Sequence, residues 1–343
     1  MRVLVTGGAG YIGSVAVAEL IHAGHEVVVY DNLSKGHTAA IPPDVAVIRA
    51  DVGDRAALDR ALAERKIEAV MHFAASIEAG ESMRVPEKFF RNNSAATLTL
   101  LEAMLCAKIH RFVFSSTAAL YGDPEHIPIR ETDPLRPTNV YGESKLLVER
   151  MLAWFARIHG LRYASLRYFN AAGATETLGE VHDPETHLIP LVLAVALHQR
   201  ENVAIFGTDY PTRDGTCVRD YIHVADLAVA HVLALEALEQ EPQLIFNLGN
   251  GRGFTVREVI EAARRVTGHA IPAVEAPRRA GDPAVLVASS EKIQKELGWR
   301  PKLPDLEEII ASAWRWFRKH PNGYPQPDAS GYAAHQSIPT PQA

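Results

Sequence analysis

Short apolar runs alternate with helical patterns over the first half of the chain. Expected strands cover residues 3–5, 25–30, 45–48, 69–73, 111–115 and 163–168, and expected helices cover 11–22, a segment from about 55, 86–107 and 141–159. Apolar strands that alternate with helices are typical of a parallel sheet covered on both faces. The pattern therefore predicts an α/β fold with a doubly wound parallel sheet of the Rossmann type.

This rhythm changes after about residue 169, where Gly, Pro, Thr and His become frequent up to residue 190. A strand at 203–206 and a helix near 224–238 are the clearest later elements. We predict a nucleotide-binding domain over 1–172, to which 219–240 returns, and a smaller C-terminal α/β substrate domain over 173–325. Residues 326–343, rich in Pro, Gly, Ser and Gln, are expected to form a flexible tail.

Three glycines, Gly7, Gly10 and Gly13, are evenly spaced between the first strand and the first helix. Glycines permit a tight turn there and let backbone N–H groups approach a pyrophosphate, while the helix N-terminus contributes partial positive charge. A glycine triplet alone is weak evidence, but here it opens a βαβ unit. The segment therefore predicts a bound dinucleotide.

Asp31 ends the second strand and is followed by Asn32 rather than by an arginine. A carboxylate at this place accepts hydrogen bonds from the ribose hydroxyls and repels a 2′-phosphate, which favours NAD over NADP. The alternative is an ordinary turn aspartate. Asp51, after the third strand, is placed to reach the adenine or, alternatively, to cap the helix that begins near Arg55.

Tyr141 and Lys145 lie four residues apart, on one face of an expected helix. The pair alone is weak evidence for a catalytic site. Ser115 and Thr117 strengthen it, because they lie at the end of the fifth strand, and ligands bind at the carboxyl ends of strands in such sheets. Thr117 has the alternative role of a strand-end cap. Together these residues resemble the Ser/Thr, Tyr and Lys of the extended short-chain dehydrogenase/reductase family.

Within that family, the chain is similar to the UDP-glucose 4-epimerases from residue 1 to about 325. The matching segments are 1–8, 30–33, 72–75, 167–170, 204–210, 219–224 and 277–282. The last three are more specific than a glycine-rich turn.

The resemblance implies two sets of site residues. NAD would be held by Gly7, Gly10, Tyr11, Ile12, Gly13, Asp31, Asn32, Leu33, Ser34, Lys35, Gly36, Asp51, Val52, Phe73, Ala74, Ala75, Asn92, Ser115, Tyr141, Lys145 and Phe169. The UDP-sugar would be held by Thr117, Tyr141, Asn170, Leu188, Ala204, Ile205, Phe206, Arg219, Tyr221, Arg279, Asp282 and Leu286.

Chemistry fits these assignments. Arg219 and Arg279 suit a diphosphate because a guanidinium is planar and always charged, although arginines in surface salt bridges are the alternative. Asp282 suits ribose hydroxyls, and Phe206 can pack on uracil. No metal ion is expected.

The resemblance implies a reaction in which Tyr141 takes the proton of the sugar 4-OH while hydride passes from C4 to NAD, and then both return. A tyrosine with a pKa near 10 is a poor base at neutral pH, and lowering it to about 7 takes roughly 4 kcal/mol. The Lys145 ammonium and the positive nicotinamide ring would supply this, while Thr117 would orient the substrate oxygen.

Two positions depart from some relatives. Ile77 stands where some carry a lysine near the cofactor, so no charged contact is expected there. Leu286 stands where some carry a tyrosine beside the sugar. Because leucine leaves more room near C2 of the sugar, we hypothesise that UDP-N-acetylhexosamines are also accepted.

Other functions stay open on this fold. Dehydratases place an acidic residue after the Ser/Thr, whereas Ala118 and Ala119 follow Thr117 here. A 4-epimerase for another UDP-sugar, a pentose or a uronate, is an alternative. A non-catalytic NAD-binding protein would not require Thr117, Tyr141 and Lys145 together.

Composition narrows the partners and the compartment. A formal net charge of −6 argues against nucleic-acid binding, and two cysteines in 343 residues indicate a reducing cytoplasm. The start of the chain lacks a signal-peptide pattern, and no apolar stretch suggests a membrane partner. The expected helices 86–107 and 141–159 predict a homodimer, as in relatives.

Overall fold

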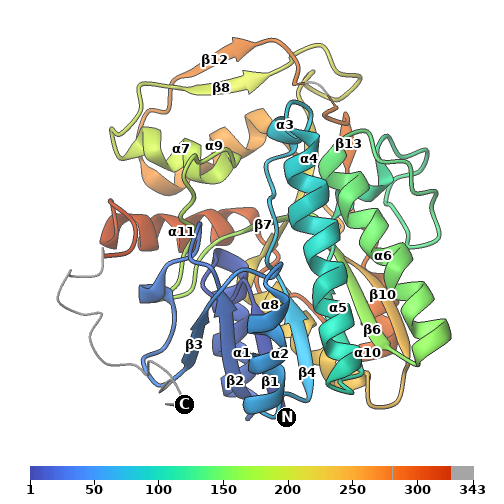
Figure 1. Cartoon of the computed structure of the whole chain (residues 1–343). Helices are drawn as coiled ribbons and strands as arrows, with labels where there is room; N and C mark the ends of the chain where they lie inside the picture. Colours follow the sequence, from blue (N-terminus) through green and yellow to red (C-terminus); the bar gives the residue numbers. More distant parts are fainter. Residues whose placement is uncertain (280, 326–343) are drawn as a thin grey trace.

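The computed structural model describes residues 1–279 and 281–325 (Figure 1). The predicted flexible tail, 326–343, lies outside the described residues. No helix within the described ranges is both long enough and apolar enough to cross a lipid bilayer.

A seven-stranded sheet in the order β10-β6-β5-β4-β1-β2-β3 forms the lower half of the molecule, and every pair in it is parallel. The strands are β1 (Arg2–Thr6), β2 (Glu26–Asp31), β3 (Ala46–Arg49), β4 (Ala69–His72), β5 (Arg111–Ser115), β6 (Arg162–Tyr168) and β10 (Gln243–Leu248). The doubly wound α/β fold predicted from the sequence is confirmed, and the six strands expected in the first half of the chain all belong to this sheet.

Helices cover both faces of the sheet because successive strand residues point to opposite sides. Val3 and Val5 of β1 belong to a core shared with α1 (Tyr11–His22) and α8 (Val224–Ala237). Leu4, between them, belongs to the opposite core, which α2 (Arg55–Glu64), α5 (Ala96–Cys106) and α6 (Val140–His159) complete. The apolar residues on each face of the sheet thus pack against a separate layer of helices.

The helix expected over 86–107 contains an irregularity. Its first turn is α4 (Pro86–Phe89), followed by a π-helical turn, η2 (Phe90–Ala95), and then by α5, and Figure 1 shows the three as one continuous rod. π-helical turns inside α-helices often mark functional sites. Here the wider turn carries Asn92, one of the residues expected to contact NAD.

The remaining strands form two small sheets above the carboxyl ends of the main sheet (Figure 1). One joins β11 (Gly253–Thr255), β9 (Val218–His223), β13 (Val285–Leu286) and β7 (Asn170–Ala172), and the other pairs β8 (Val203–Phe206) with β12 (Ala273–Ala276). The helices α7 (Leu188–Ala196), α9 (Val256–Thr267) and α11 (Leu306–Lys319) enclose a third core. The short elements are η1 (Thr38–Ala40), α3 (Ala79–Ser82), η3 (Ala118–Tyr121) and α10 (Glu291–Leu297).

The segment 219–240, expected to return to the nucleotide-binding domain, divides between the two layers. Its strand β9 lies in a small sheet, whereas its helix α8 packs beside α1 on the main sheet. The chain then adds β10 to the edge of the main sheet, next to β6, which the sequence did not indicate. The domain boundaries themselves stay a prediction.

Candidate active site

The glycine turn between β1 and α1 is packed too tightly for any side chain. A Cβ atom on Gly13 would lie 2.1 Å from the carbonyl oxygen of Gly7, and one on Gly7, where φ is +72°, would lie 2.5 Å from the amide nitrogen of Ala74. The N-cap of α1 is Gly10, which has no side chain to satisfy the first N–H groups of the helix. Those donors are therefore left for an anion, as a pyrophosphate site requires.

Asp31 is buried beside this turn, with 8% of its surface exposed. Its carboxylate accepts hydrogen bonds from the amides of Ala9, at 3.0 Å, and Leu33, at 2.8 Å. Burial raises the pKa of Asp31, and the two amides oppose that rise. The Leu33 contact is one that an ordinary turn aspartate makes, whereas the Ala9 contact ties the carboxylate to the glycine turn.

The alternative role for Asp51 as a helix cap is wrong. Asp54 caps α2, and its carboxylate accepts a hydrogen bond from the amide of Ala57 at 3.0 Å. Asp51 instead accepts hydrogen bonds from the Asn32 side chain, at 2.8 Å, and from the amide of Gly53. Asn32 and Asp51 thus form one polar edge next to Asp31, where the adenosine end of a dinucleotide was expected.

The residues after Asn32 fold back over the glycine turn. A Cβ atom on Gly36 would lie 2.6 Å from the Cβ of Ala9, and the Ser34 amide donates to the Asn32 side chain. The Lys35 ammonium donates to the carbonyl of Asp183 in the upper layer. Tyr11 is also engaged by that layer, because its hydroxyl donates to the carbonyl of Gly173 at 2.6 Å.

Lys145 is buried at the carboxyl end of β5, and only 2% of its surface is exposed. Its ammonium donates to the carbonyl oxygen of Ser115 at 2.9 Å and lies 4.8 Å from the centre of the Phe114 ring. Burial lowers the pKa of Lys145 to about 7. The lysine side chain therefore joins α6 to the strand that carries Ser115 and Thr117.

Tyr141 lies one turn before Lys145, on the turn of α6 that packs against the residues after Thr117. Burial raises the pKa of Tyr141 above its usual range, the nearby Tyr168 adds to the rise, and the Thr117 side chain opposes it. Thr117 also accepts a hydrogen bond from the amide of Ala119 at 3.1 Å and so caps η3. The capping role proposed as an alternative for Thr117 is real, and it coexists with the effect of Thr117 on the pKa of Tyr141.

The start of α6 fixes where Tyr141 points. Asn139 caps the helix by accepting a hydrogen bond from the amide of Gly142 at 2.8 Å. A Cβ atom on Gly142 would lie 2.6 Å from the carbonyl oxygen of Ala119. The first turn of α6 thus lies directly against the turn that follows Thr117, which brings the two hydroxyls together.

The π-helical turn is connected to the same place through side chains. Asn93 accepts a hydrogen bond from the amide of Ser76, at 2.8 Å, and donates to Ser144 of α6, at 3.0 Å. Asn92 donates to the Ser76 hydroxyl at 3.2 Å. The wider helical turn therefore sets Asn92 beside the end of β4, near Tyr141 and Lys145.

Arg219 and Asp282 form a pair in the upper layer. The guanidinium nitrogen Nη2 lies 2.5 Å from Oδ1 of Asp282, and only 12% of the Arg219 side chain is exposed. The Asp282 carboxylate raises the pKa of Arg219 despite the cost of burying it. The alternative role for Arg219 was a salt bridge at the surface. Arg219 does form a salt bridge, but the pair is largely buried. Arg279 lies over Phe206 instead, with its guanidinium carbon 4.0 Å from the ring centre.

The other expected substrate residues differ in what they can offer a ligand. Asn170 begins β7 next to Tyr221 of β9, and Leu188 begins α7. Ile205 and Tyr221 belong to the third core, with 3% and 5% of their surface exposed, so their side chains face protein. A contact of Ile205 with a sugar nucleotide would have to use its backbone.

Phe169 and Leu286 pack together close to Thr117. Both belong to a small core with Ala118, and 7% and 9% of their surfaces are exposed. The amides of Phe73 and Ala74 donate to the carbonyl of Thr6 at the glycine turn, Ala75 follows them directly in the chain, and Val52 belongs to the core that contains Leu4. The structure thus places expected cofactor residues at the carboxyl ends of strands of the main sheet, while Phe206, Arg219, Arg279 and Asp282 lie in the upper layer.

Comparison with known proteins decides which family has this arrangement. A sequence profile described as the NAD dependent epimerase/dehydratase family matches residues 3–249. The chain belongs to this family.

Several similar family members are named UDP-glucose 4-epimerase. The chain is 56% identical to the UDP-glucose 4-epimerase of Halalkalibacterium halodurans, over 94% of this chain and 98% of the relative, and 53% identical to that of Streptomyces lividans, over 94% and 98%. A crystal structure of a UDP-glucose 4-epimerase superposes with a TM-score of 0.92 at 51% identity, over 95% and 100% of the two chains. One from Bifidobacterium longum, solved with NAD+ and UDP, gives 0.91 at 39% identity, over 94% and 100%. The resemblance seen in the sequence is confirmed.

The residues of this epimerase/dehydratase family member fit NAD. The N-terminus of α1 has no side-chain cap, the glycine turn before it is too tight for a Cβ atom at Gly7 or Gly13, and the Asp31 carboxylate lies beside that turn. A carboxylate there suits two ribose hydroxyls and disfavours a 2′-phosphate. The NAD dependence expected from the sequence agrees with the family.

The sequence did not point to several neighbours of the site. Tyr168 shares a hydrogen bond with Ser115 at 2.7 Å, and His72 lies between the hydroxyls of Thr6, at 2.6 Å, and Thr97, at 2.9 Å. Burial, followed by the charge of Lys145, lowers the pKa of His72 to about 3. Tyr168 and His72 stand at strand ends and within the matching segments 167–170 and 72–75, but neither was assigned a role from the sequence.

Proposed function

We propose that this protein is a UDP-glucose 4-epimerase, which interconverts UDP-galactose and UDP-glucose by removing hydride from C4 of the sugar and returning it to the opposite face. The observation that carries the proposal is that the first turn of α6, which holds Tyr141, packs against the turn after Thr117, while buried Lys145 of the same helix donates to Ser115. An identity of 56% to a UDP-glucose 4-epimerase over nearly the whole chain supports the same substrate.

The proposed chemistry divides between the cofactor and the protein. NAD, when bound, accepts the hydride from C4 and gives it back. Tyr141 takes the proton of the 4-OH as the sugar becomes a 4-keto sugar and returns it as the hydride comes back, so protons and electrons balance over the cycle. Thr117 holds the same oxygen by a hydrogen bond, which keeps C4 in line with Tyr141.

The charge states of Tyr141 and Lys145 shape this step. Burial disfavours both the phenolate and the ammonium, so it raises the pKa of Tyr141 and lowers that of Lys145 to about 7. A bound nicotinamide ring that carries a positive charge would favour the phenolate of Tyr141, and a neutral ring would favour its phenol, so Tyr141 would act as the base in one half of the cycle and as the acid in the other.

The upper layer is proposed to hold UDP while the keto sugar turns. Arg219 and Arg279 supply two guanidinium groups for the diphosphate, and Phe206 supplies a ring for the uracil. In the structure Arg219 is paired with Asp282 and Arg279 lies on Phe206. Each guanidinium is therefore already held by a protein contact in the upper layer. Phosphate oxygens of UDP would add to these contacts or replace them.

The test is to incubate the purified protein with UDP-galactose, without added NAD, and to identify the product by chromatography. We expect UDP-glucose, because the cofactor is restored in each cycle.

Tyr141→Phe should fold and keep NAD but lose about 10²–10⁴-fold in rate, the usual contribution of a positioned acid–base group. Tyr163→Phe, which alters a buried tyrosine of β6, is the matched control. An inactive wild-type protein, or a Tyr141→Phe variant with near wild-type activity, would overturn the proposal.

We also propose that UDP-N-acetylhexosamines are substrates. Leu286 packs against Phe169 and Ala118 near Thr117, and a leucine there leaves room that a tyrosine would fill. A solved relative, the UDP-Glc/GlcNAc 4-epimerase of Campylobacter jejuni, is 42% identical. Leu286→Tyr should lower turnover of UDP-N-acetylgalactosamine far more than turnover of UDP-galactose. Equal effects on both would refute this role.

Epimerisation of another UDP-sugar is the alternative. A relative named UDP-glucose-4-epimerase from Stenotrophomonas maltophila, 41% identical, was solved with formylated UDP-arabinopyranose. Measuring kcat/KM with a UDP-pentose, a UDP-uronate and UDP-galactose under the same conditions distinguishes the alternative substrates. The proposal requires the highest value for UDP-galactose.

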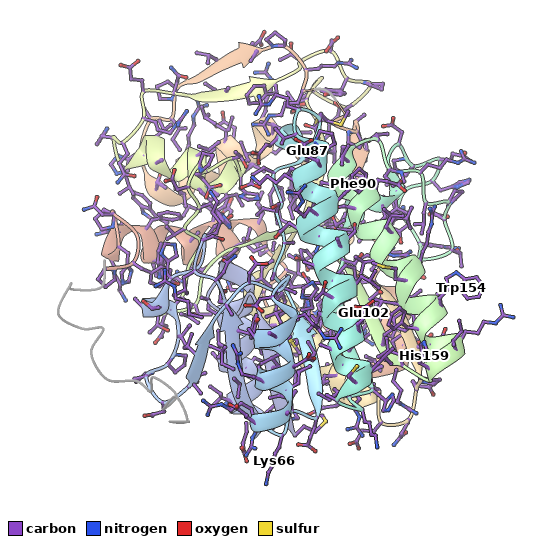
Figure 2. The ribbon with its side chains drawn as sticks, in the orientation of Figure 1. Lys66, Glu87, Phe90, Glu102, Trp154 and His159 are labelled. Atoms are coloured by element: carbon purple, nitrogen blue, oxygen red, sulfur yellow. The ribbon has the colours of Figure 1, made fainter. Side chains whose placement is uncertain are left out.

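We propose that the protein forms a cytoplasmic homodimer through the face built by α5 and α6. Figure 2 shows Trp154 on the outer side of α6, and Trp154, Ile158 and Leu98 are exposed at 57%, 64% and 36%. Large exposed apolar side chains on neighbouring helices are typical of an interface. Light scattering coupled to gel filtration should give twice the chain mass, and Trp154→Glu with Ile158→Glu should give the monomer.

A further inference from the structure

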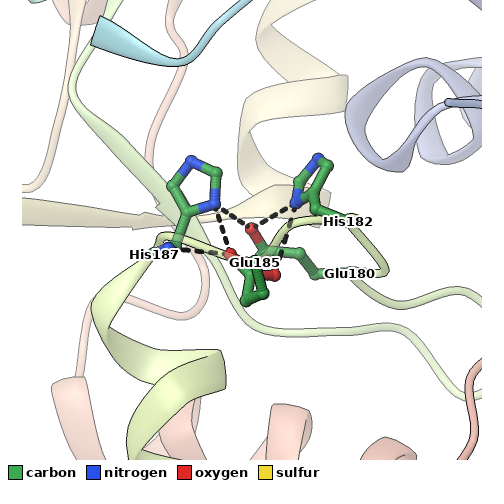
Figure 3. Close-up of side chains that lie close together, drawn as sticks. All are labelled: Glu180, His182, Glu185 and His187. Carbon is green, nitrogen blue, oxygen red and sulfur yellow. Dashed lines mark hydrogen bonds and ion pairs between the residues drawn. The ribbon is translucent and has the colours of Figure 1, made fainter. Parts of the chain in front are cut away.

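Four side chains from one short segment converge above the glycine turn. Glu180, His182, Glu185 and His187 lie between β7 and α7, in a stretch without helix or strand, and their potential ligand atoms all lie within 4.8 Å of one another. Figure 3 shows both imidazole rings directing Nδ1 toward the two carboxylates. None of the four residues is a cysteine, and the sequence analysis expected no metal ion.

The spacing of these atoms suits a tetrahedral metal centre. His182 Nδ1 lies 3.2 Å from Glu180 Oε1 and 3.5 Å from Glu185 Oε2, and His187 Nδ1 lies 3.0 Å and 2.8 Å from Oε1 of the same two glutamates. Zinc bound at about 2.0–2.2 Å in a tetrahedron separates neighbouring ligand atoms by about 3.3–3.5 Å. The observed separations need only a small expansion to accept the ion.

Burial adds an argument about charge. The Glu180 side chain is only 5% exposed and that of Glu185 19%, so two carboxylates share a poorly solvated site and repel each other. One divalent cation cancels both charges. Two protonated imidazoles would do so as well, but His182 Nδ1 is buried and makes no hydrogen bond of acceptable geometry. A coordination bond would satisfy that nitrogen without requiring hydrogen-bond geometry toward either carboxylate.

We propose that Glu180, His182, Glu185 and His187 bind one Zn²⁺ ion, or a similar divalent transition-metal ion, in a closed four-ligand site. Two imidazole nitrogens with two carboxylate oxygens form a ligand set that zinc accepts, whereas Mg²⁺ and Ca²⁺ prefer oxygen alone. Because the protein supplies all four ligands, the site is structural rather than catalytic.

The position of the site indicates what the ion would hold together. The His182 ring lies 6.4 Å from the Tyr11 ring at the start of α1, and Lys35 donates to the carbonyl of Asp183 within the same segment. His187 is followed directly by α7 of the upper layer. A bound ion would therefore fix the connection between the dinucleotide turn and the upper layer.

The experiment measures metal in the full-length chain, purified without a histidine tag. The protein is exposed to Zn²⁺, passed over a gel-filtration column and analysed by plasma mass spectrometry. We expect about one zinc ion per chain in the wild type. The double variant His182→Ala with His187→Ala should lose that ion, whereas His126→Ala, which removes an exposed histidine elsewhere, should keep it.

A second readout does not depend on the variants folding. Cobalt loaded into the wild-type protein should show the strong visible absorption of a four-coordinate ion, and the thermal unfolding midpoint should rise with Zn²⁺ concentration because the ion binds the folded state. A wild-type chain that retains no zinc and shows no such spectrum would overturn the proposal. Zinc that persists in a folded double variant would overturn it as well, by placing the ion elsewhere.

Discussion

The Lys145 ammonium donates a hydrogen bond to the carbonyl oxygen of Ser115 at 2.9 Å, which ties α6 to the carboxyl end of β5. Tyr141 lies one helical turn earlier and Thr117 two residues after Ser115, so this bond adds to the packing of Gly142 on Ala119 in holding together the elements that carry both hydroxyls. Lys145 thus has a positioning role in addition to its charge, and exchanging it should alter more than the acidity of Tyr141.

The buried position of Lys145 predicts a pH-dependent stability. An unfolded lysine keeps its proton up to about 10.5, whereas burial lowers the pKa of Lys145 to about 7. Between these values the unfolded chain binds one more proton than the folded chain, so this residue makes the free energy of unfolding rise with pH. Urea unfolding of the NAD-free protein, compared with Lys145→Met from pH 7 upward, should show a difference that changes steadily with pH. A constant difference would contradict the lowered pKa.

Replacing Asp31 should weaken the preference for NAD. A charge-assisted hydrogen bond contributes about 1.5–3 kcal/mol, so Asp31→Asn should raise the Kd for NAD by about 10–100-fold. Binding of NADP should be affected much less, because the repulsion of its 2′-phosphate disappears at the same time. Titration of NAD-free protein with each dinucleotide measures the ratio.

Asp59→Asn provides the control for that measurement, because it removes one carboxylate that is paired with Arg55 on the surface. Its Kd values should match those of the wild type. If Asp31→Asn also left the NAD/NADP ratio unchanged, Asp31 would be an ordinary turn aspartate.

Adding one methyl group to Gly13 should remove the cofactor. The new Cβ would lie 2.1 Å from the carbonyl oxygen of Gly7, so the turn has to open. We expect Gly13→Ala to unfold more easily, by about 1–3 kcal/mol, as overpacked sites do, and to be purified without NAD. Gly80→Ala, where a Cβ meets nothing within 4 Å, should behave like the wild type. Cofactor content measured from the absorbance of the released dinucleotide checks both, and a Gly13→Ala protein with full NAD would contradict the tight turn.

The buried pair of Arg167 and Glu149 should contribute strongly to stability. Their side chains are only 4% and 6% exposed, and the guanidinium lies 2.6 Å from the carboxylate. Glu149→Gln leaves a buried charge without its counterion, and breaking such a pair costs about 3–5 kcal/mol. The exposed pair of Arg136 and Glu125 is the comparison, since Glu125→Gln should cost at most about 1 kcal/mol. Calorimetry of both variants measures the loss in free energy of unfolding. Equal losses for Glu149→Gln and Glu125→Gln would contradict a strong contribution from the buried pair.

The elements predicted from the sequence are confirmed where short apolar runs alternate with helical patterns. The apolar run of β1, which is buried on both faces, and the glycine spacing after it locate the sheet and the turn, because both depend on local chain geometry. The π-helical turn at 90–95 was not predicted because it is stabilised by contacts of Asn93 with Ser76 and Ser144, which are distant in sequence.

The same limit applies to the candidate site. Asp54, and not Asp51, caps α2. The direction of the backbone after β3 decides between the two. The pairing of Arg219 with Asp282 joins β9 to a segment sixty residues later, and Ile205 faces the third core because of its register with β12. Residue type identified these positions, but only tertiary packing determines their partners.

The most direct test of the central claim follows the hydrogen atom on C4. UDP-galactose labelled with deuterium at C4 is converted by the purified protein in ordinary water, and the mass of the UDP-glucose product is measured. If hydride leaves C4 and returns to the same carbon within a site closed to exchange, the product keeps the deuterium. Loss of deuterium to solvent would contradict the account, because it would mean that C4 gives up a proton and not a hydride.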